Sequence, residues 1–251
     1  MSRPASLIVP IARRESSFSK NEIERYEAGM LASLIIEINR LARPFDFYDC
    51  GADIGIVSLG LIRRTTLLMH VYAVEPNAEA FQYLEKSAKN WPVEANVFNK
   101  ALSDFIGRGR LVSPATDQSA HAKFLEQDVA GDIDVVRLDD IAEQSGRVVV
   151  LKIDVEGGEA ALIDGAMKTL GAAPAFVIVF EAHPHVYQRG GSDPCEIIKK
   201  IEAIAPIKFL VAVKPEFEID LNKSFFSQWP TTKESNCNIV CASKTVGETH
   251  R

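Results

Sequence analysis

The sequence predicts one α/β domain built on a doubly wound, mostly parallel sheet. From residue 45 onward, strand-like apolar runs alternate with helical stretches, which indicates right-handed crossovers between parallel strands. The early and middle runs are almost continuously apolar, as expected when helices cover both faces of the sheet. With 251 residues, 47% of them hydrophobic, the chain is long enough to bury one core of this kind.

An amphipathic helix precedes the sheet and makes residues 1–43 an N-terminal extension of a domain that spans 44–251. Ser19 and Glu22 have the spacing of a capping box, and Pro44 ends the helix. Such a helix either packs on the edge of the domain, the more common arrangement, or covers a site as a lid. Its apolar residues recur at three- and four-residue steps: Ile23, Tyr26, Met30, Leu31, Leu34, Ile38 and Leu41.

Seven strands follow, with helices between them. Residues 113–131 are polar and weakly patterned, and they predict a loop with short helical pieces. The predicted helices cover residues 78–90, 159–170 and 194–205. The predicted strands cover residues 45–50, 70–75, 94–102, 148–154, 175–182, 207–213 and 238–243.

Composition excludes several classes of protein. A net charge of −6 and a pI near 5.5 argue against a broad nucleic-acid interface, which needs a basic face. The first residues, "MSRPASLIVPIARRESS", contain only a four-residue apolar run before Pro10. This run is too short for a secretory signal or a membrane span, so a cytoplasmic location is the default expectation.

The four cysteines predict structural thiols rather than a metal site. Cys50 and Cys195 stand alone in the sequence. Cys237 and Cys241 fall four residues apart on one predicted strand. Four residues of strand span roughly 13 Å, too far for both thiols to bind one zinc ion directly.

Polar residues follow five of the predicted strands. In doubly wound sheets, ligands bind outside the carboxyl ends of the strands, so these side chains are expected to converge on one crevice. A single acidic strand end usually caps a helix, but five polar ends together favour a ligand site, because burying them unpaired is costly. In chain order the residues are Asp49; Glu75, Pro76 and Asn77; Ser103 and Asp104; Asp154 and Glu156; Glu181 and His183.

Glu75 and the glycine turn before it indicate an adenosine-containing ligand. Glu75 lies 24 residues after Gly51, where an acidic residue typically binds ribose hydroxyls. The alternative is that Glu75 caps the following helix, although Asn77 is the better cap.

The turn itself discriminates between ligands. It reads Gly51-Ala52-Asp53-Ile54-Gly55, so Asp53 occupies the position of the second glycine in the dinucleotide fingerprint GxGxxG. A carboxylate beside a diphosphate costs on the order of several kcal/mol at low dielectric. S-adenosylmethionine (SAM) carries a sulfonium cation and no phosphate. The turn is therefore compatible with SAM and unfavourable for NAD.

Five segments in this order resemble the FkbM family of SAM-dependent methyltransferases: "YDCGADIG", "VYAVEPNAEAF", "NKALSD", "VVRLDDI" and "LKIDVEGGEAALIDGA". The likeness covers roughly residues 45 to 185, and "KIDVEGGE" is its most specific part. The N-terminal helix and the chain after about residue 190 match only in general layout. The resemblance implies a Rossmann-like class I methyltransferase sheet of seven strands, the last of them antiparallel.

The resemblance also implies a set of cofactor contacts. Asp49, Gly51, Ala52 and Gly55 are expected at the methionine end of SAM. Glu75 is expected at the ribose, Pro76 and Asn77 beside the adenosine, and Ser103 and Asp104 near the adenine. Asp53 departs from the family pattern, in which Asn, His or Ser is more usual. Members of the family typically methylate hydroxyl groups on sugars or natural products, so the expected partner is a small-molecule or glycan hydroxyl acceptor.

Methyl transfer to a hydroxyl needs alignment and often a base. The candidate bases are Asp154, Glu181 and His183, and His183 is alternatively a loop residue that caps the fifth strand. Asp154 acts either as the base or as a group that orients the SAM amine and the acceptor. Lys152, on the same strand face, is expected to pair with Asp154 in a structural role.

Other possibilities stay open at this stage. A magnesium or calcium site built from Asp154, Glu156, Glu181, His183 and His185 is not favoured, because nothing in their spacing demands it. An NAD-dependent oxidoreductase and a non-catalytic SAM-binding protein are the competing functions. Residues 214–236 include several aromatic side chains that line an acceptor pocket, form an oligomer interface or, most commonly, pack the loop: Phe217, Phe225, Phe226 and Trp229. The acceptor and the oligomeric state are not determined by the sequence.

Overall fold

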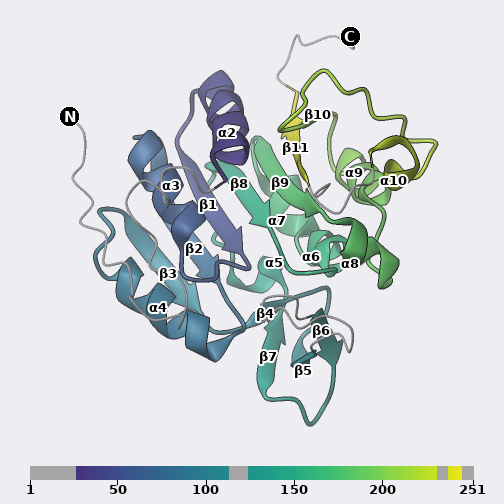
Figure 1. The fold of residues 1–251 in the computed structure, drawn as a ribbon. Coiled ribbons are helices and arrows are strands. Elements are labelled where there is room, and N and C mark those ends of the chain that lie inside the picture. The colour runs from purple at the N-terminus through teal and green to yellow at the C-terminus, as the bar shows by residue number, and fades with distance from the viewer. Residues whose placement is uncertain (1–26, 113–123, 231–236, 245–251) are drawn as a thin grey trace.

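A seven-stranded sheet forms the centre of the computed structural model, which describes residues 27–112, 124–230 and 237–244 (Figure 1). Its strand order is β10-β11-β9-β8-β1-β2-β3. All neighbouring strands are parallel except β11, which is antiparallel to both β9 and β10. The predicted doubly wound sheet with an antiparallel last strand is therefore confirmed. The strands are β1 (Phe45–Cys50), β2 (Leu68–Val74), β3 (Glu94–Phe98), β8 (Val148–Ile153), β9 (Phe176–Ala182), β10 (Ile207–Val211) and β11 (Cys237–Ser243).

Helices cover both faces of this sheet. One face packs against α2 (Ala28–Leu41), α3 (Ile56–Arg64) and α4 (Ala78–Ala88). The other packs against α6 (Glu159–Asp164), α7 (Met167–Ala172) and α9 (Pro194–Glu202). Three short helices, α5 (Leu138–Ile141), α8 (Pro184–Gln188) and α10 (Phe225–Gln228), lie in the connections. None of the helices within the described ranges is both long and apolar enough to cross a lipid bilayer.

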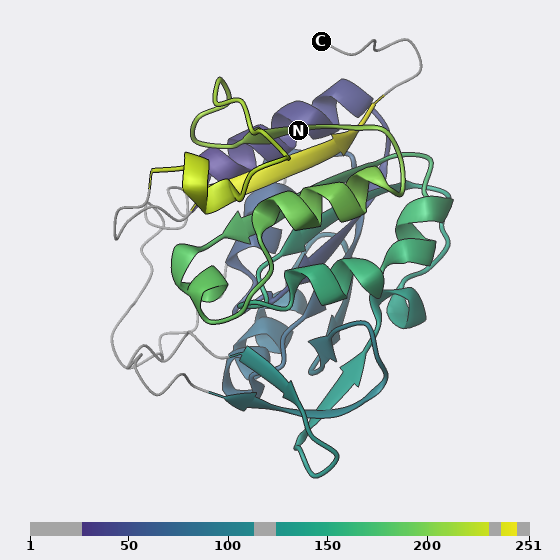
Figure 2. The same cartoon turned by 90° about the vertical axis from the view of Figure 1, so that its right-hand side faces the viewer.

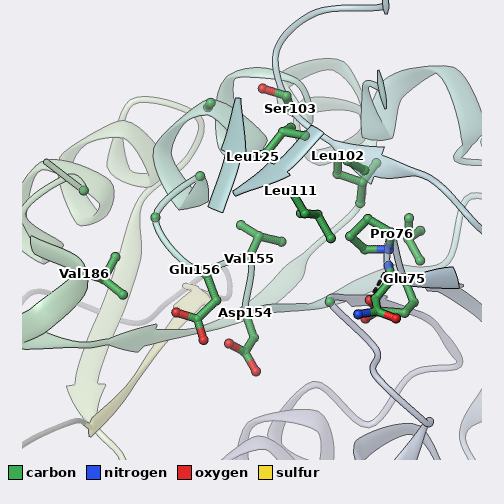
Figure 3. Close-up of a pocket in the computed structure, with 18 of the residues that line it drawn as sticks. Glu75, Pro76, Leu102, Ser103, Leu111, Leu125, Asp154, Val155, Glu156 and Val186 are labelled. Atoms are coloured by element: carbon green, nitrogen blue, oxygen red, sulfur yellow. Dashed lines mark hydrogen bonds between the residues drawn. The ribbon is translucent and has the colours of Figure 1, made fainter. Parts of the chain in front are cut away.

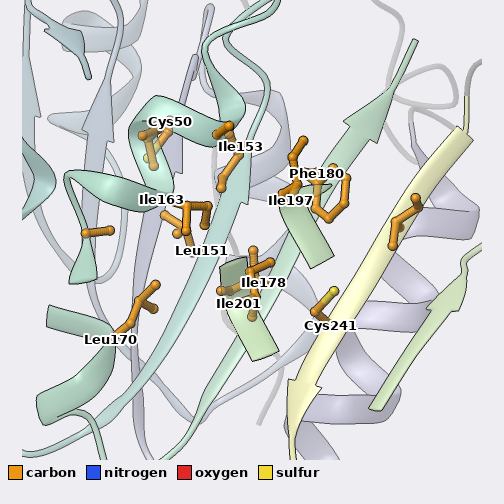
Figure 4. Close-up of a cluster of buried hydrophobic side chains, with 14 of the residues drawn as sticks. Cys50, Leu151, Ile153, Ile163, Leu170, Ile178, Phe180, Ile197, Ile201 and Cys241 are labelled. Atoms are coloured by element: carbon orange, nitrogen blue, oxygen red, sulfur yellow. The ribbon is translucent and has the colours of Figure 1, made fainter. Parts of the chain in front are cut away.

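The apolar strands explain this layering. Alternate residues of one strand face opposite layers, so Val150 belongs to the core on the α2 side and Leu151 to the core on the α9 side. Figure 4 shows Phe180 of β9 beside Ile197 of α9, and Leu151 of β8 beside Ile163 of α6. Burial on both faces is the reason that these strands read as continuous apolar runs.

Helix α2 is part of the core. The predicted stripe is confirmed where the structure describes it, because Met30, Leu31, Leu34, Ile38 and Leu41 are buried. The helix contacts α3, β9 and β11. It ends at Leu41, followed by Ala42 in the left-handed conformation, two residues before Pro44. Ser19, Glu22, Ile23 and Tyr26 lie outside the described residues.

A second sheet of four strands was not predicted. It contains β4 (Ala101–Leu102), β5 (Gly107–Val112), β6 (Phe124–Gln127) and β7 (Ile133–Val136), in the order β4-β7-β5-β6. Figures 1 and 2 show it beyond one end of the main sheet. The loop predicted for residues 113–131 is wrong at β6, and residues 113–123 lie outside the described ranges.

Two predicted elements are each divided in the structure. The strand predicted over 94–102 breaks into β3 and β4, because the Asn99 side chain donates hydrogen bonds to the carbonyls of Glu75 and Pro76. The helix predicted over 159–170 breaks into α6 and α7 at Gly165. A Cβ at Gly165 would lie 2.1 Å from the carbonyl oxygen of Ser103, so this turn packs directly on the chain after β4.

Two smaller predictions are confirmed. Cys50, Cys195, Cys237 and Cys241 are free and buried, and burial raises the pKa of each thiol above its usual value. Aromatic residues after β10 pack the loop against the α9 side of the core. Phe225 is fully buried, with ring-centroid separations of 5.7 Å to Trp229 and 6.5 Å to Phe217.

Candidate functional site

A cavity of about 660 Å³ lies at the carboxyl ends of β1, β2, β8 and β9 (Figure 3). Its size suits a small-molecule ligand. Leu111 of β5 and Leu125 of β6 add an apolar wall from the second sheet. Nine of the residues predicted for the site line it: Gly51, Asp53, Glu75, Pro76, Asn77, Ser103, Asp154, Glu156 and Glu181.

Five other predicted residues are not among those that line the cavity. Asp49 is fully buried behind the glycine turn and accepts a hydrogen bond from the Ser58 hydroxyl at 2.6 Å. Ala52 is also buried, and Gly55 is the N-cap residue of α3. Asp104 is exposed and accepts a hydrogen bond from Ser103. The Nδ1 atom of His183 accepts a hydrogen bond from the backbone N–H of His185 at 3.2 Å, so His183 caps α8.

The glycine turn approaches the end of β8 very closely. Gly51 has a φ of 77°, and a Cβ there would lie 1.9 Å from the carbonyl oxygen of Asp154. The N–H groups of Gly51 and Ala52 both donate to the carbonyl of Val74 at 3.0 Å, which ties the turn to β2. Asp53 has a φ of 48°, a left-handed conformation that aspartate tolerates better than most side chains do.

Glu75 connects the turn to the start of α4. One carboxylate oxygen accepts a hydrogen bond from the N–H of Asp53 and the other accepts one from the N–H of Asn77, each at 2.8 Å. Burial raises the pKa of this carboxyl group, and the two N–H donors oppose the rise. Each oxygen retains capacity to accept a further hydrogen bond from a ligand. Asn77 is the cap of α4, as predicted, because its side chain accepts from the N–H groups of Glu79 and Ala80.

Lys152 holds the turn and the end of β8 together. Its ammonium group is 2.6 Å from the carbonyl oxygen of Gly51 and 3.3 Å from a carboxylate oxygen of Asp154. It also lies 3.5 Å from a carboxylate oxygen of Asp49. The predicted pairing of Lys152 with Asp154 is confirmed, and the buried lysine has the geometry of a structural residue.

Glu156 is a site residue whose role was not predicted from sequence. It has a φ of 56°, and Gly157, with a φ of 115°, continues the turn. The Glu159 carboxylate accepts a hydrogen bond from the N–H of Gly157 at 2.9 Å and so braces this turn. Glu156 lines the cavity, and a guanidinium nitrogen of Arg189 lies 3.8 Å from one of its carboxylate oxygens.

The electrostatic surroundings of Glu156 place its titration near neutrality. Burial, followed by repulsion from Asp154 and Glu181, raises the pKa of Glu156 to about 7. The sequence signal was present in Gly157 after Glu156, because a φ of 115° suits glycine. The pKa, in contrast, depends on burial in the folded cavity and partly on Glu181 of β9, and cannot be read from that motif. Among the residues that the structure describes, no group of three or more His, Cys, Asp or Glu side chains is arranged to hold a metal ion.

The chain is similar to known proteins in sequence and in fold. The model of the methyltransferase FkbM domain family matches residues 49–205. A solved structure of the methyltransferase FkbM from Methylobacillus flagellatus KT is 18% identical with a TM-score of 0.50, over 78% of this chain and 43% of that one. The chain thus spans less than half the length of that protein. The similarity between the two structures supports the fold described for the main sheet.

Two further solved structures align with most of the chain at lower TM-scores. The precorrin-6y C5,15-methyltransferase from Geobacter metallireducens GS-15 is 12% identical, with a TM-score of 0.45, over 92% of this chain and 93% of that one. The N-terminal domain of human METTL16, solved in complex with SAH, is 9% identical with a TM-score of 0.46, over 95% of this chain and 76% of that one. A search of the curated proteins gives no match.

Because Gly51 lies so close to the backbone of Asp154, adding one methyl group at Gly51 is expected to destabilise the folded protein. Gly51→Ala is expected to lower the free energy of unfolding by about 2–4 kcal/mol, because the new Cβ must displace the Asp154 backbone and the residue must keep a positive φ. Gly171→Ala is the matched control. Gly171 lies in α7 with open space around it, so its replacement should be neutral or stabilising by up to about 1 kcal/mol. Urea unfolding measures both, and equal stabilities of the two variants would contradict the packing described at Gly51.

Proposed function

The chain belongs to the methyltransferase FkbM domain family, and on this premise we propose that it transfers a methyl group from SAM to a hydroxyl group of a small molecule or glycan. One observation carries the proposal: a single cavity joins the glycine turn after β1, Glu75 after β2 and the acidic segment after β8. All three lie within the residues that the family model matches. We further propose that residues 1–43 are an N-terminal extension of a methyltransferase domain at 44–251.

The cavity has the features that a nucleoside with a cationic sulfur requires. We propose that Glu75, with one remaining acceptor position on each oxygen, binds the two ribose hydroxyls. Pro76, Asn77 and Ser103 would lie along the adenosine, and exposed Asp104 would lie near the adenine. Gly51 and Asp154 would hold the methionine end, while Asp49, Ala52 and Gly55 shape the turn from behind. SAM supplies a methyl group activated by the positive charge on its sulfur.

The charge of the cavity disfavours the competing NAD-dependent oxidoreductase. Asp53 and Glu75, which line the cavity, are joined by a hydrogen bond from the N–H of Asp53 to the Glu75 carboxylate. A diphosphate placed against the Asp53 carboxylate would meet repulsion that SAM does not meet, whereas a carboxylate at the position of Glu75 binds ribose hydroxyls in either cofactor. Turnover of labelled SAM distinguishes an enzyme from a non-catalytic SAM-binding protein.

Glu156 is the residue that we propose as the general base. A base is most effective when its pKa lies near the working pH, and Glu156 meets this condition within the cavity. Asp154 is held by Lys152 and would orient the acceptor and the SAM amine. Glu181 is a second candidate base on the cavity wall. His183 is the weakest candidate, because its Nδ1 already accepts the hydrogen bond that caps α8.

The ribose assignment predicts a specific loss of cofactor affinity. Glu75→Gln should weaken binding of S-adenosylhomocysteine (SAH) by about 10- to 100-fold, the loss expected for hydrogen bonds to a charged group. Asp53→Asn should keep SAH affinity within a few-fold, because it leaves the backbone N–H and the turn intact. Titration calorimetry measures both, with a melting curve for each variant. Complete loss of binding in Asp53→Asn would reveal an essential contact of Asp53, and tight NAD binding without SAH binding would refute the proposed function.

The proposed base predicts the pH dependence of methyl transfer. The carboxylate form accepts the proton, so kcat/KM should fall about tenfold for each pH unit below about 7 and reach a plateau above it. Glu156→Gln should lower kcat by about 10²- to 10⁴-fold and abolish the fall of kcat/KM below pH 7. The assay uses labelled SAM with an acceptor found by screening hydroxylated small molecules, and Glu79→Gln on the surface of α4 is the control. An unchanged profile in Glu156→Gln would rule out Glu156 as the base.

A further inference from the structure

Two leucines of the second sheet face the cavity instead of a core. Leu111 of β5 and Leu125 of β6, which we call the leucine pair, are direct partners in the antiparallel register, and both line the cavity. Both side chains are partly exposed, and neither belongs to the two apolar cores of the described chain. Apolar side chains that remain open at a cavity are typical of a surface that a ligand covers.

The fold directs the leucine pair into the cavity. Successive residues of a strand point to opposite faces, so Arg110 and Glu126, which are also register partners, point away from the leucines, and both are exposed. Gly109 makes room for this arrangement, because a Cβ there would lie 2.7 Å from the Cδ1 atom of Leu125. Strands β5 and β6 are thus amphipathic, with an apolar pair toward the cavity and a charged pair toward solvent.

Val155 connects the leucine pair to the reactive end of the cavity. It stands between Asp154 and Glu156 in the chain, is half-buried and lines the same cavity. Figure 3 shows Val155 rising from the end of β8 toward the strands that carry the leucine pair. A molecule whose hydroxyl reaches the Glu156 carboxylate therefore has Val155 beside it, and the leucine pair forms the next part of the wall.

The position of the leucine pair in the second sheet favours the acceptor over the nucleoside as the molecule that covers it. In the proposed function the adenosine lies along the residues that follow β2 and β4. Pro76 and Leu102 already supply apolar contacts there. The order of the second sheet is β4-β7-β5-β6, so the leucine pair lies on the two strands farthest from β4. We therefore assign it to the second ligand.

We propose that the methyl acceptor carries an apolar group beside its reactive hydroxyl, and that the leucine pair and Val155 hold this group. This inference rests on the proposed function, since it narrows the acceptor class of that same site. The class is an aryl or alkyl derivative of a hydroxylated molecule, rather than a sugar that is polar on every side. Leu111 and Leu125 then determine specificity, because burying apolar surface against them favours the derivative that carries the apolar group.

The apolar group is a spectator in the methyl transfer. The acceptor O–H bond breaks and its proton moves to the Glu156 carboxylate. The oxygen forms a bond to the methyl carbon as the carbon–sulfur bond breaks, and the electron pair of that bond stays on sulfur to give SAH. The leucine pair takes no part in these steps and acts only on the affinity and position of the acceptor.

The test compares two ligands that share a sugar and differ in one apolar group. The protein saturated with SAH is titrated at pH 7 with phenyl β-D-glucopyranoside and with methyl β-D-glucopyranoside in a calorimeter. The phenyl glycoside is expected to bind at least tenfold more tightly, because its ring is buried against the leucine pair. Leu111→Ser and Leu125→Ser should each reduce this preference to about threefold or less, while SAH affinity stays within a few-fold.

Ile106→Ser is the matched control for these variants. Ile106 directly precedes β5, is 64% exposed and is not among the residues that line the cavity, so its replacement should preserve the preference. A melting curve for each variant verifies the fold, and the two leucine variants are read independently, so that one carries the test if the other unfolds.

The other outcomes separate the acceptor assignment from the proposed function. Equal affinities for the two glycosides, absence of phenyl glycoside binding, or an unchanged preference in both leucine variants would refute the apolar acceptor while SAH binding stands. A loss of SAH affinity of tenfold or more in the leucine variants would place the adenine against the leucine pair and also refute it. Failure of the wild-type protein to bind SAH would instead refute the proposed function, and the acceptor assignment with it.

Discussion

The buried ammonium group of Lys152 is the interaction on which the site depends. It bonds to the carbonyl oxygen of Gly51 and lies close to the carboxylates of both Asp49 and Asp154, so one cation attracts the acidic ends of two neighbouring strands. Removing one partner of a buried pair typically costs about 3–5 kcal/mol, because the remaining charge is left uncompensated. With this lysine in place, the glycine turn can lie directly against the end of β8. The cavity wall from Gly51 to Glu156 follows from that contact.

Much of this arrangement was predictable from the sequence, because it depends on local patterns. The bounds of β1 agree with the prediction at residues 45–50, and the polar ends of the apolar runs do mark the edge of the sheet where the cavity lies. The second sheet was missed because β5 contains Gly107 and Gly109 and carries exposed Arg108 and Arg110, so it has little apolar pattern. The strand break at Asn99 depends on side-chain bonds to a distant segment, which no local pattern reveals.

The electrostatics of the site were predictable only in part. Asp53 in the glycine turn indicated a ligand without phosphate, and the structure adds a geometric reason for its presence, since the position has a positive φ and its N–H bonds to Glu75. The behaviour of Glu156 could not be derived in this way. Its left-handed turn is continued by Gly157, but its raised pKa depends first on burial and then on repulsion from Asp154 and Glu181. Glu181 lies 25 positions later in the chain and meets it only in the folded sheet. Charge interactions between strands are a property of the fold.

We propose that one cavity holds the nucleoside at Glu75 and presents its reactive end to the acidic segment after β8. A crystal structure of the protein with SAH bound would locate the nucleoside. The ribose hydroxyls should lie within hydrogen-bonding distance of the Glu75 carboxylate, with the sulfur facing the side of the cavity that contains Asp154 and Glu156. SAH bound outside this cavity, or with its ribose away from Glu75, would contradict it.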